Sequence, residues 1–262
     1  MLSSTLRSTR TRRWLIWLAV AGLLVAVTAP RAGWPLFGLA LLGLALVQTA
    51  RLETAVADTR RELHALVQIR PLLDRLPVEM GGWAAEPLML HQVVQALIET
   101  RPRLVVECGS GGSTVLIARC LQSLGGGCLV SIDHDPTFAA RTESLLQLHG
   151  ATQTATVVRA PLEERRTRDG RTLRWYGPGY EPLLTGPVDV LIVDGPPGGG
   201  SPRARYPALP LLAPFLSPNC VILLDDGDRP DEREIAREWG RELNAHVSYI
   251  QGGRGGWLLR RR

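Results

Sequence analysis

Four acidic residues far apart in the sequence each follow an apolar run of strand length. They are Glu107 after residues 104–106, Asp133 after 128–132, Asp194 after 188–193 and Asp225 after 220–224. The carboxyl ends of parallel strands meet at one edge of an open α/β sheet, so the four carboxylates are predicted to converge there. One such residue is often only a helix cap or turn residue, but four in register favour a ligand site.

A glycine-rich turn, residues 109–112, directly follows the first of these runs, and Ser113 or Thr114 is placed to cap the next helix. Glycine has no Cβ and tolerates positive φ, so backbone N–H groups in such a turn stay accessible to a bound molecule. A strand, a glycine turn and a helix predict the first βα unit of a Rossmann-like sheet. Further strands are expected near 155–158, and two late pieces, 246–250 and 257–259, are expected to form an antiparallel edge.

The expected ligand carries hydroxyls and a positive charge. Carboxylates at Glu107 and Asp133 would repel phosphates but accept hydrogen bonds from ribose hydroxyls and an ammonium group. The dinucleotide pattern G-x-G-x-x-G would need glycine at Thr114, and the chain contains no lysine for a phosphate-binding loop. S-adenosylmethionine meets this description and is the predicted cofactor.

Four blocks in order, V-E-C-G-S-G-G-S-T, S-I-D-H-D-P, V-D-V-L-I-V-D-G-P-P-G and V-I-L-L-D-D-G-D-R, resemble the class I S-adenosylmethionine-dependent methyltransferases. The resemblance runs from about Trp83 to the C-terminus. It is strongest to a branch of small bacterial enzymes with E-x-G-S-G-x-S-T, D-G-P-P-G and R-Y-P-A-L-P-L-L signatures. The chain departs from the commonest pattern at Gly112 and Ser113, where many members place a third glycine after one intervening residue.

The resemblance implies a role for each motif. Glu107, Gly109 and Gly111 would hold the methionine part, Asp133 the ribose hydroxyls, and His134 with residues 160–162 would border the adenine. Asp194 would lie near the transferred methyl group. The full predicted cofactor-binding set is Glu107, Gly109, Ser110, Gly111, Ser113, Asp133, His134, Pro161 and Asp194.

Asp194 and Asp225 are the predicted catalytic residues, with Asp194 as the base that takes a proton from an oxygen or nitrogen acceptor. No metal site is predicted. The alternative is that Asp194, Asp225 and Asp226 bind a hard cation such as Mg²⁺, as in the resembling catechol-type O-methyltransferases, which commonly carry Asp-Asn at the later pair. Asp226 and Asp228 are equally suited to cap the following helix.

Arginine and aromatic side chains after the glycine-rich loop 195–200 and before the apolar run 188–193 are candidates for the acceptor pocket, together with one earlier tryptophan. They are Arg203, Arg205, Tyr206, Trp175, Tyr176, Tyr180 and Trp83. Packed aromatics and surface arginines are the simpler interpretation of the same residues.

The N-terminal 50 residues carry five arginines and no acid, which accounts for the whole formal charge of +5. The remaining chain is neutral, so nucleic acid is not an expected partner. Two uncharged runs, 14–29 and 33–50, are each near the lower limit of about 17 residues for a membrane-spanning helix, and tryptophans flank them. They predict a transmembrane hairpin in the cell membrane with the catalytic domain in the cytoplasm. A cleaved signal peptide is the alternative, but Pro30 suits its cleavage site poorly.

A charged, periodic segment from 52 to 76 predicts a juxtamembrane helix that could pair in a homodimer or pack on the domain. The predicted domains are a membrane anchor at 1–50, a linker at 51–78 and a methyltransferase domain at 79–262. With an anchor, the methyl acceptor is expected to be a lipid, a glycan precursor, a protein or a small molecule.

Two other functions fit parts of the sequence. Asp133-His134-Asp135 and Asp226-Gly227-Asp228 both match the D-x-D pattern of metal-dependent glycosyltransferases. A non-catalytic membrane scaffold that retains the fold is the second alternative. The position of Asp133, one strand after the glycine turn, favours the methyltransferase.

Overall fold

The computed structural model describes residues 17, 20, 21, 30–73, 85–167, 170–198 and 201–261. The chain divides into two compact units, 1–60 and 61–262. The domain limits predicted from the sequence stay predictions.

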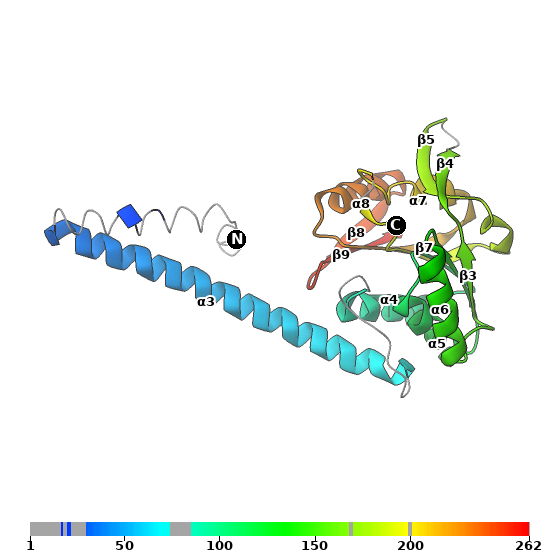
Figure 1. The fold of residues 1–262 in the computed structure, drawn as a ribbon, viewed down its shortest axis with the longest axis horizontal. Coiled ribbons are helices and arrows are strands. Elements are labelled where there is room, and N and C mark those ends of the chain that lie inside the picture. Colours follow the sequence, from blue (N-terminus) through cyan, green and yellow to red (C-terminus); the bar gives the residue numbers. More distant parts are fainter. Residues whose placement is uncertain are drawn as a thin grey trace. The chain divides into compact units, whose positions relative to one another are not determined.

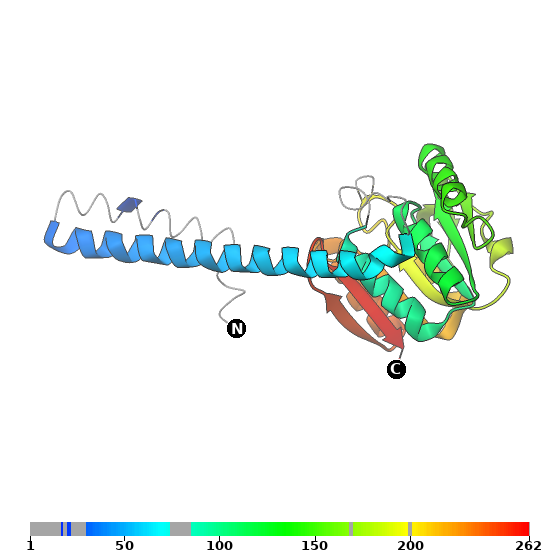
Figure 2. The same cartoon turned by 90° about the horizontal axis from the view of Figure 1, so that it is seen from below.

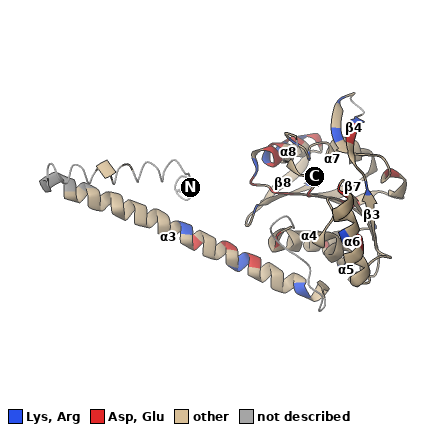
Figure 3. Cartoon of the chain, viewed as in Figure 1, with Lys and Arg blue, Asp and Glu red and all other residues tan. Residues whose placement is uncertain are grey.

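Residues 30–69 form one continuous helix, α3 (Pro30–Ile69), which ends in a 3₁₀ turn, η1 (Arg70–Leu73) (Figures 1 and 2). The uncharged run that ends at residue 50 and the juxtamembrane helix expected from residue 52 are therefore parts of one helix. Gly43 is the one glycine or proline in residues 39–69 of this helix, whereas Pro71 lies two residues after its last residue, within η1. In Figure 3 the charged residues drawn on α3 gather toward its C-terminal end; by sequence, residues 33–50 carry no charge and Arg51 is the first charged residue after them.

Among the described residues one helix, Phe37–Leu73, is long and apolar enough to cross a membrane by length and composition. The first helix of the predicted hairpin lies outside the described residues, apart from Trp17, Val20 and Ala21.

A seven-stranded sheet with the order β3-β2-β1-β6-β7-β9-β8 forms the centre of the second unit. Its strands are β1 (Leu104–Cys108), β2 (Cys128–Asp133), β3 (Ala155–Arg159), β6 (Val188–Val193), β7 (Leu216–Asp225), β8 (Ala245–Ile250) and β9 (Gly256–Arg261). The first five strands in this order, β3 to β7, are parallel to one another, while β9 is antiparallel to both β7 and β8. The predicted Rossmann-like sheet with an antiparallel edge is confirmed.

Helices cover both faces of this sheet (Figure 1). On one face are α4 (Pro87–Thr100), α5 (Gly112–Ser123) and α6 (Pro136–Leu148); on the other are α7 (Ala208–Leu212), η4 (Ala213–Phe215) and α8 (Pro230–Glu242). Alternate strand residues serve the two layers: Val105 and Val190 pack with α4 and α5, whereas Val106 and Leu191 pack with α7 and α8. Strands buried on both faces read as continuous apolar runs, which is why the sequence revealed them.

The charged segment after β3 forms a hairpin of β4 (Leu162–Arg166) and β5 (Thr172–Tyr176). A short 3₁₀ turn, η2 (Glu181–Leu183), follows. Across 204–215 the helical residues are confined to α7 and η4, because prolines at 202, 207, 210 and 214 prevent a longer helix. Neither Ser113 nor Thr114 is the N-cap residue of α5. That position belongs to Gly111, whose N–H donates to Thr114 Oγ1 at 2.9 Å.

Candidate functional site

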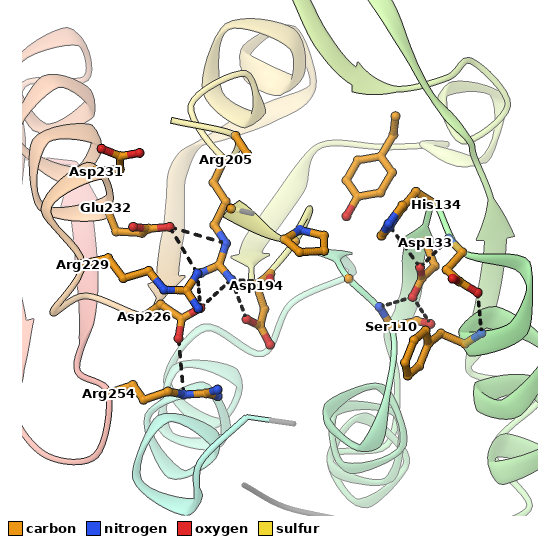
Figure 4. A pocket seen from close by; sticks show the side chains of 18 of the residues that line it. Ser110, Asp133, His134, Asp194, Arg205, Asp226, Arg229, Asp231, Glu232 and Arg254 are labelled. Atoms are coloured by element: carbon orange, nitrogen blue, oxygen red, sulfur yellow. Dashed lines mark hydrogen bonds and ion pairs between the residues drawn. The ribbon is translucent and has the colours of Figure 1, made fainter. Parts of the chain in front are cut away.

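A cavity of about 760 Å³ lies at the carboxyl ends of β1, β2, β6 and β7. Its lining falls into two groups that face one another in Figure 4. Ser110, Asp133 and His134 form one end, which we call the β2 end. Asp194, Arg205, Asp226, Arg229, Glu232 and Arg254 form the other, which we call the β7 end. Open α/β sheets bind ligands at this edge because loops of neighbouring strands diverge there.

Asp133 is the only strand-end acid at the β2 end, and it is held there by neutral donors. Its Oδ2 accepts from the Ser110 N–H at 2.9 Å and the Ser110 hydroxyl at 2.6 Å, and its Oδ1 accepts from the Asp135 N–H at 2.9 Å. His134 Nδ1 lies 3.5 Å from Oδ1. A carboxylate offers about four acceptor positions, so the side chain keeps capacity for a hydroxyl of a ligand.

Gly109 and Gly195, which follow β1 and β6, touch each other in the floor of the cavity. Gly109 has φ +94°, and a Cβ there would lie 3.1 Å from Gly195 N. A Cβ on Gly195 would lie 3.0 Å from Gly109 Cα and 2.4 Å from the Tyr176 hydroxyl oxygen. Both positions therefore require glycine, because any side chain would separate the two loops and occupy space next to the ligand.

Glu107 lies beneath the glycine turn, fully buried, and does not line the cavity. Its Oε2 accepts hydrogen bonds from Thr114 Oγ1 at 2.6 Å and Ser131 Oγ at 2.7 Å. Burial raises the pKa of Glu107 to about 7, against the opposing hydrogen bonds of Ser113, Thr114 and Ser131. The carboxylate thus joins β1, β2 and the start of α5 under the turn.

The other predicted cofactor residues divide in the same way. Gly109, Ser110 and His134 line the cavity, and the His134 ring lies edge-on to Tyr176 with centroids 6.3 Å apart. Gly111, Ser113 and Pro161 do not line it; the Pro161 carbonyl instead accepts from the Gly177 N–H at 2.8 Å, which anchors β5.

At the β7 end Arg205 is the centre of a network of acidic groups, and only 3% of its side chain is exposed. Its Nη2 donates to the Asp194 carbonyl at 2.6 Å, Asp226 Oδ2 at 2.6 Å and Asp194 Oδ1 at 3.1 Å. Its Nη1 donates to the Asp225 carbonyl at 2.8 Å. One guanidinium therefore ties the ends of β6 and β7 together.

Two further arginines complete this network. Arg229 Nη1 lies 3.0 Å from Asp226 Oδ2 and 3.8 Å from Glu232 Oε1. Arg254, from the turn between β8 and β9, has its Nε 3.3 Å from Asp226 Oδ1. Asp226 is thus surrounded by three cations, and it has a positive φ of 58°.

Burial raises the pKa of Asp194 well above its usual range; the nearby Asp225 adds to the shift and Arg205 opposes it. Burial likewise raises the pKa of Asp225. Asp194 lines the cavity, but Asp225 does not: its Oδ1 accepts from the Asp226 N–H at 2.8 Å. Of the two predicted catalytic residues, Asp194 alone faces the ligand space, with a base strength increased by its surroundings.

Mg²⁺ does not fit the acidic residues as they are arranged. Asp194 and Asp226 both direct oxygens at Arg205 Nη2, which occupies the point that they would share with a metal. Across the described ranges no group of three or more His, Cys, Asp or Glu side chains could hold a metal ion. The D-x-D residues have other partners: Asp135 caps α6 through Thr137 N–H, and Asp228 accepts from the Tyr249 hydroxyl at 2.5 Å.

Some of the residues predicted for the acceptor pocket line the cavity and others do not. Arg205 and Tyr176 line the cavity, whereas Arg203 pairs with Glu238 on α8, and Trp175, Tyr180 and Tyr206 are buried in the core. Trp83 lies outside the described residues. Sequence reasoning missed four cavity-lining residues, Phe138, Arg229, Glu232 and Arg254. The glycines at 252, 253, 255 and 256 around Arg254 were the one available signal.

The sheet order, its antiparallel edge and the strand-end cavity define a Rossmann-like α/β fold with a ligand-sized site at the carboxyl ends of its parallel strands. Residues 106–227 match the family model described as a methyltransferase domain, which covers both loops of the cavity floor. A search of curated protein sequences finds no match.

Solved structures with the same fold include three methyltransferases. The SAH-bound methyltransferase PaMTH1 of Podospora anserina has a TM-score of 0.52 and 15% identity, covering 82% of this chain and 96% of that one. A Geobacter sulfurreducens methyltransferase has a TM-score of 0.50 and 15% identity, covering 75% and 88%. The Bacillus cereus O-methyltransferase in complex with SAH has a TM-score of 0.50 and 14% identity, covering 78% and 91%. At these identities the likeness concerns the fold.

Proposed function

We propose that the chain is an S-adenosylmethionine-dependent methyltransferase that methylates an oxygen or nitrogen of its acceptor. The observation that carries the proposal is the β2 end, where Asp133 and the glycine turn face one cavity with Asp194. The methyltransferase-domain match over 106–227 and the SAH-bound neighbours of the same fold support it.

The residues at the β2 end suit the cofactor. Gly109 and Gly195 bring backbone close to the ligand without side chains between, and Asp133 retains acceptor capacity for ribose hydroxyls. His134 and Phe138 line the same cavity, and their rings would border the adenine. When bound, S-adenosylmethionine supplies a methyl group on a positively charged sulfur.

At the β7 end Asp194 holds the acceptor and takes its proton. S-adenosylmethionine would supply the methyl group and leave as S-adenosylhomocysteine, the acceptor oxygen or nitrogen would gain the methyl carbon in place of its proton, and Asp194 would take that proton. Orientation of the acceptor in line with the sulfonium does most of the catalytic work. Because the pKa of Asp194 is raised, it is a stronger base than an ordinary carboxylate, and activity should rise as pH rises through that pKa.

Membrane attachment is part of the proposal. The uncharged part of α3 supports one membrane span. The second span and the cytoplasmic side of the catalytic domain are proposed from the sequence, namely the uncharged run 14–29 and the arginines before it. Leu52, Val56 and Leu63 are at least 59% exposed along α3, which supports a homodimer through this helix. An anchored enzyme would act on a lipid, a glycan precursor, a membrane protein or a small molecule near the membrane.

Calorimetric titration of the purified full-length chain tests the proposal. One molecule of S-adenosylmethionine is expected to bind to each chain, and a nucleotide sugar with Mn²⁺ is expected not to bind. Binding of the nucleotide sugar alone would favour the glycosyltransferase alternative, and binding of neither would favour the scaffold. Mass spectrometry of lipid and glycan extracts from deletion and wild-type cells should then show a difference of one methyl group in the acceptor.

A further inference from the structure

One side chain occupies the position that the acidic residues of β6 and β7 would offer to a cation. Arg205 Nη2 has three oxygens within 3.1 Å, two from Asp194 and one from Asp226. Arg205 Nη1 adds the Asp225 carbonyl at 2.8 Å. Carboxylate and carbonyl oxygens from two strand ends are the ligands that hard cations prefer, yet here they converge on a guanidinium.

We propose that the Arg205 guanidinium takes the place of a divalent cation, so that the β7 end of the methyltransferase proposed above is held together without a metal. The inference rests on that proposed function and adds a positioning residue to it. Arg205 fixes Asp194 beside the ligand space and compensates part of the negative charge of the four acids around it.

The surrounding chain holds Arg205 in this position. Its segment, 201–207, is pinned to α8 because the Arg203 N–H donates to Asp231 Oδ2 at 2.8 Å and the Arg203 guanidinium pairs with Glu238. The side chains of Arg205, Asp226 and Glu232 are no more than 4% exposed. Water therefore screens this charge network weakly, and removal of the guanidinium would leave buried carboxylates with a strong demand for another cation.

Two buried carboxylate oxygens show where that cation would bind. Asp225 Oδ2 and Asp226 Oδ1 make no hydrogen bond, and their nearest charges belong to Arg254 at 3.8 and 3.3 Å. With Arg205 shortened, Arg229 and Arg254 remain beside Asp226, but the oxygens of Asp194 and Asp226 lose the buried guanidinium that they share. Arg205 thus determines whether the site takes a metal.

Titration of the full-length chain with Mn²⁺ tests this directly. Binding is measured as the loss of the free-ion signal in electron paramagnetic resonance. Wild type is expected to bind no Mn²⁺ at the site, while Arg205→Ala is expected to bind one ion per chain with a Kd at least about tenfold below the highest Mn²⁺ concentration tested. Adding Asp226→Asn to Arg205→Ala should abolish that binding, and Arg205→Lys, which keeps a positive charge, should behave as wild type. Arg233→Ala, on the exposed side of α8, is the matched control and should leave Mn²⁺ binding unchanged.

Two results would overturn the inference. One is stoichiometric Mn²⁺ binding by wild type that Asp226→Asn weakens, a result that requires no folded variant at position 205. The other is a folded Arg205→Ala chain, checked by circular dichroism, that binds no Mn²⁺. S-adenosylmethionine titration of wild type separates the two proposals, because failure to bind the cofactor would contradict the function whatever the Mn²⁺ result.

Discussion

The two ends of the cavity both present strand-end carboxylates, but their partners differ in charge. At the β2 end Asp133 accepts from the N–H and hydroxyl of Ser110 and from a second backbone N–H, all neutral donors. At the β7 end Asp194 and Asp226 share the Arg205 guanidinium, and Arg229 and Arg254 add two further cations around Asp226.

This difference separates two kinds of work. A carboxylate held only by neutral donors is a strong acceptor for hydroxyls, at about 1.5–3 kcal/mol for each charged hydrogen bond. Carboxylates held by the buried Arg205 guanidinium are fixed in place and compensated, which suits the positioning of a base. The β2 end is therefore suited to recognise a ligand, and the β7 end to keep a reactive group in place.

Removal of the guanidinium should give the largest effect on stability. Arg205→Ala leaves Asp194 and Asp226 buried without their shared partner, and we expect a loss of about 3–5 kcal/mol in the free energy of unfolding. Arg229→Ala is the comparison, because 44% of that side chain is exposed and solvent screens its ion pair, so its loss should be about 1 kcal/mol or less. Urea unfolding followed by circular dichroism without added metal measures both. Equal losses would contradict the difference that we infer between buried and exposed arginines.

Glu107 should make stability depend on pH. Its pKa is raised from 4.5 to about 7 in the folded chain, so the folded state keeps a proton that the unfolded state has lost between these values. Burial of Glu107 therefore lowers stability progressively as pH rises through this window, by no more than about 3 kcal/mol. Glu107→Gln should be more stable than wild type at about pH 8, with the advantage shrinking toward about pH 5. A difference independent of pH in urea unfolding would show that Glu107 stays ionised.

Two glycines of the turn should differ in how much stability is lost when each is replaced by alanine, and this difference should be smaller than the effects above. Gly109→Ala places a side chain at φ +94° and 3.1 Å from Gly195 N, so we expect a loss of about 2 kcal/mol. A Cβ at Gly111 meets nothing within 4 Å, so Gly111→Ala should stay within about 0.5 kcal/mol of wild type. Thermal unfolding of the two variants compares them, and a larger effect at Gly111 would contradict the structure of the turn.

The sequence predicted the sheet well because its strands are continuous apolar runs that end in acids and glycines. It predicted the β2 end for the same reason, since Ser110 and Asp133 lie next to strand ends. It did not predict the β7 network, because Arg229 and Arg254 reach Asp226 from other elements and nothing local marks such pairing. Glu107 also shows the limit: its position under the turn depends on Ser131 and Thr114 from neighbouring elements.

The central claim is that the β2 end binds the cofactor and the β7 end does not determine its affinity. Calorimetric titration of S-adenosylhomocysteine into wild type, Asp133→Asn and Asp226→Asn tests it most directly. Loss of charged hydrogen bonds predicts that Asp133→Asn binds about 10- to 100-fold more weakly, and Asp226→Asn within about threefold of wild type. Unchanged binding by Asp133→Asn, or an equal loss in Asp226→Asn, would contradict the assignment of the two ends.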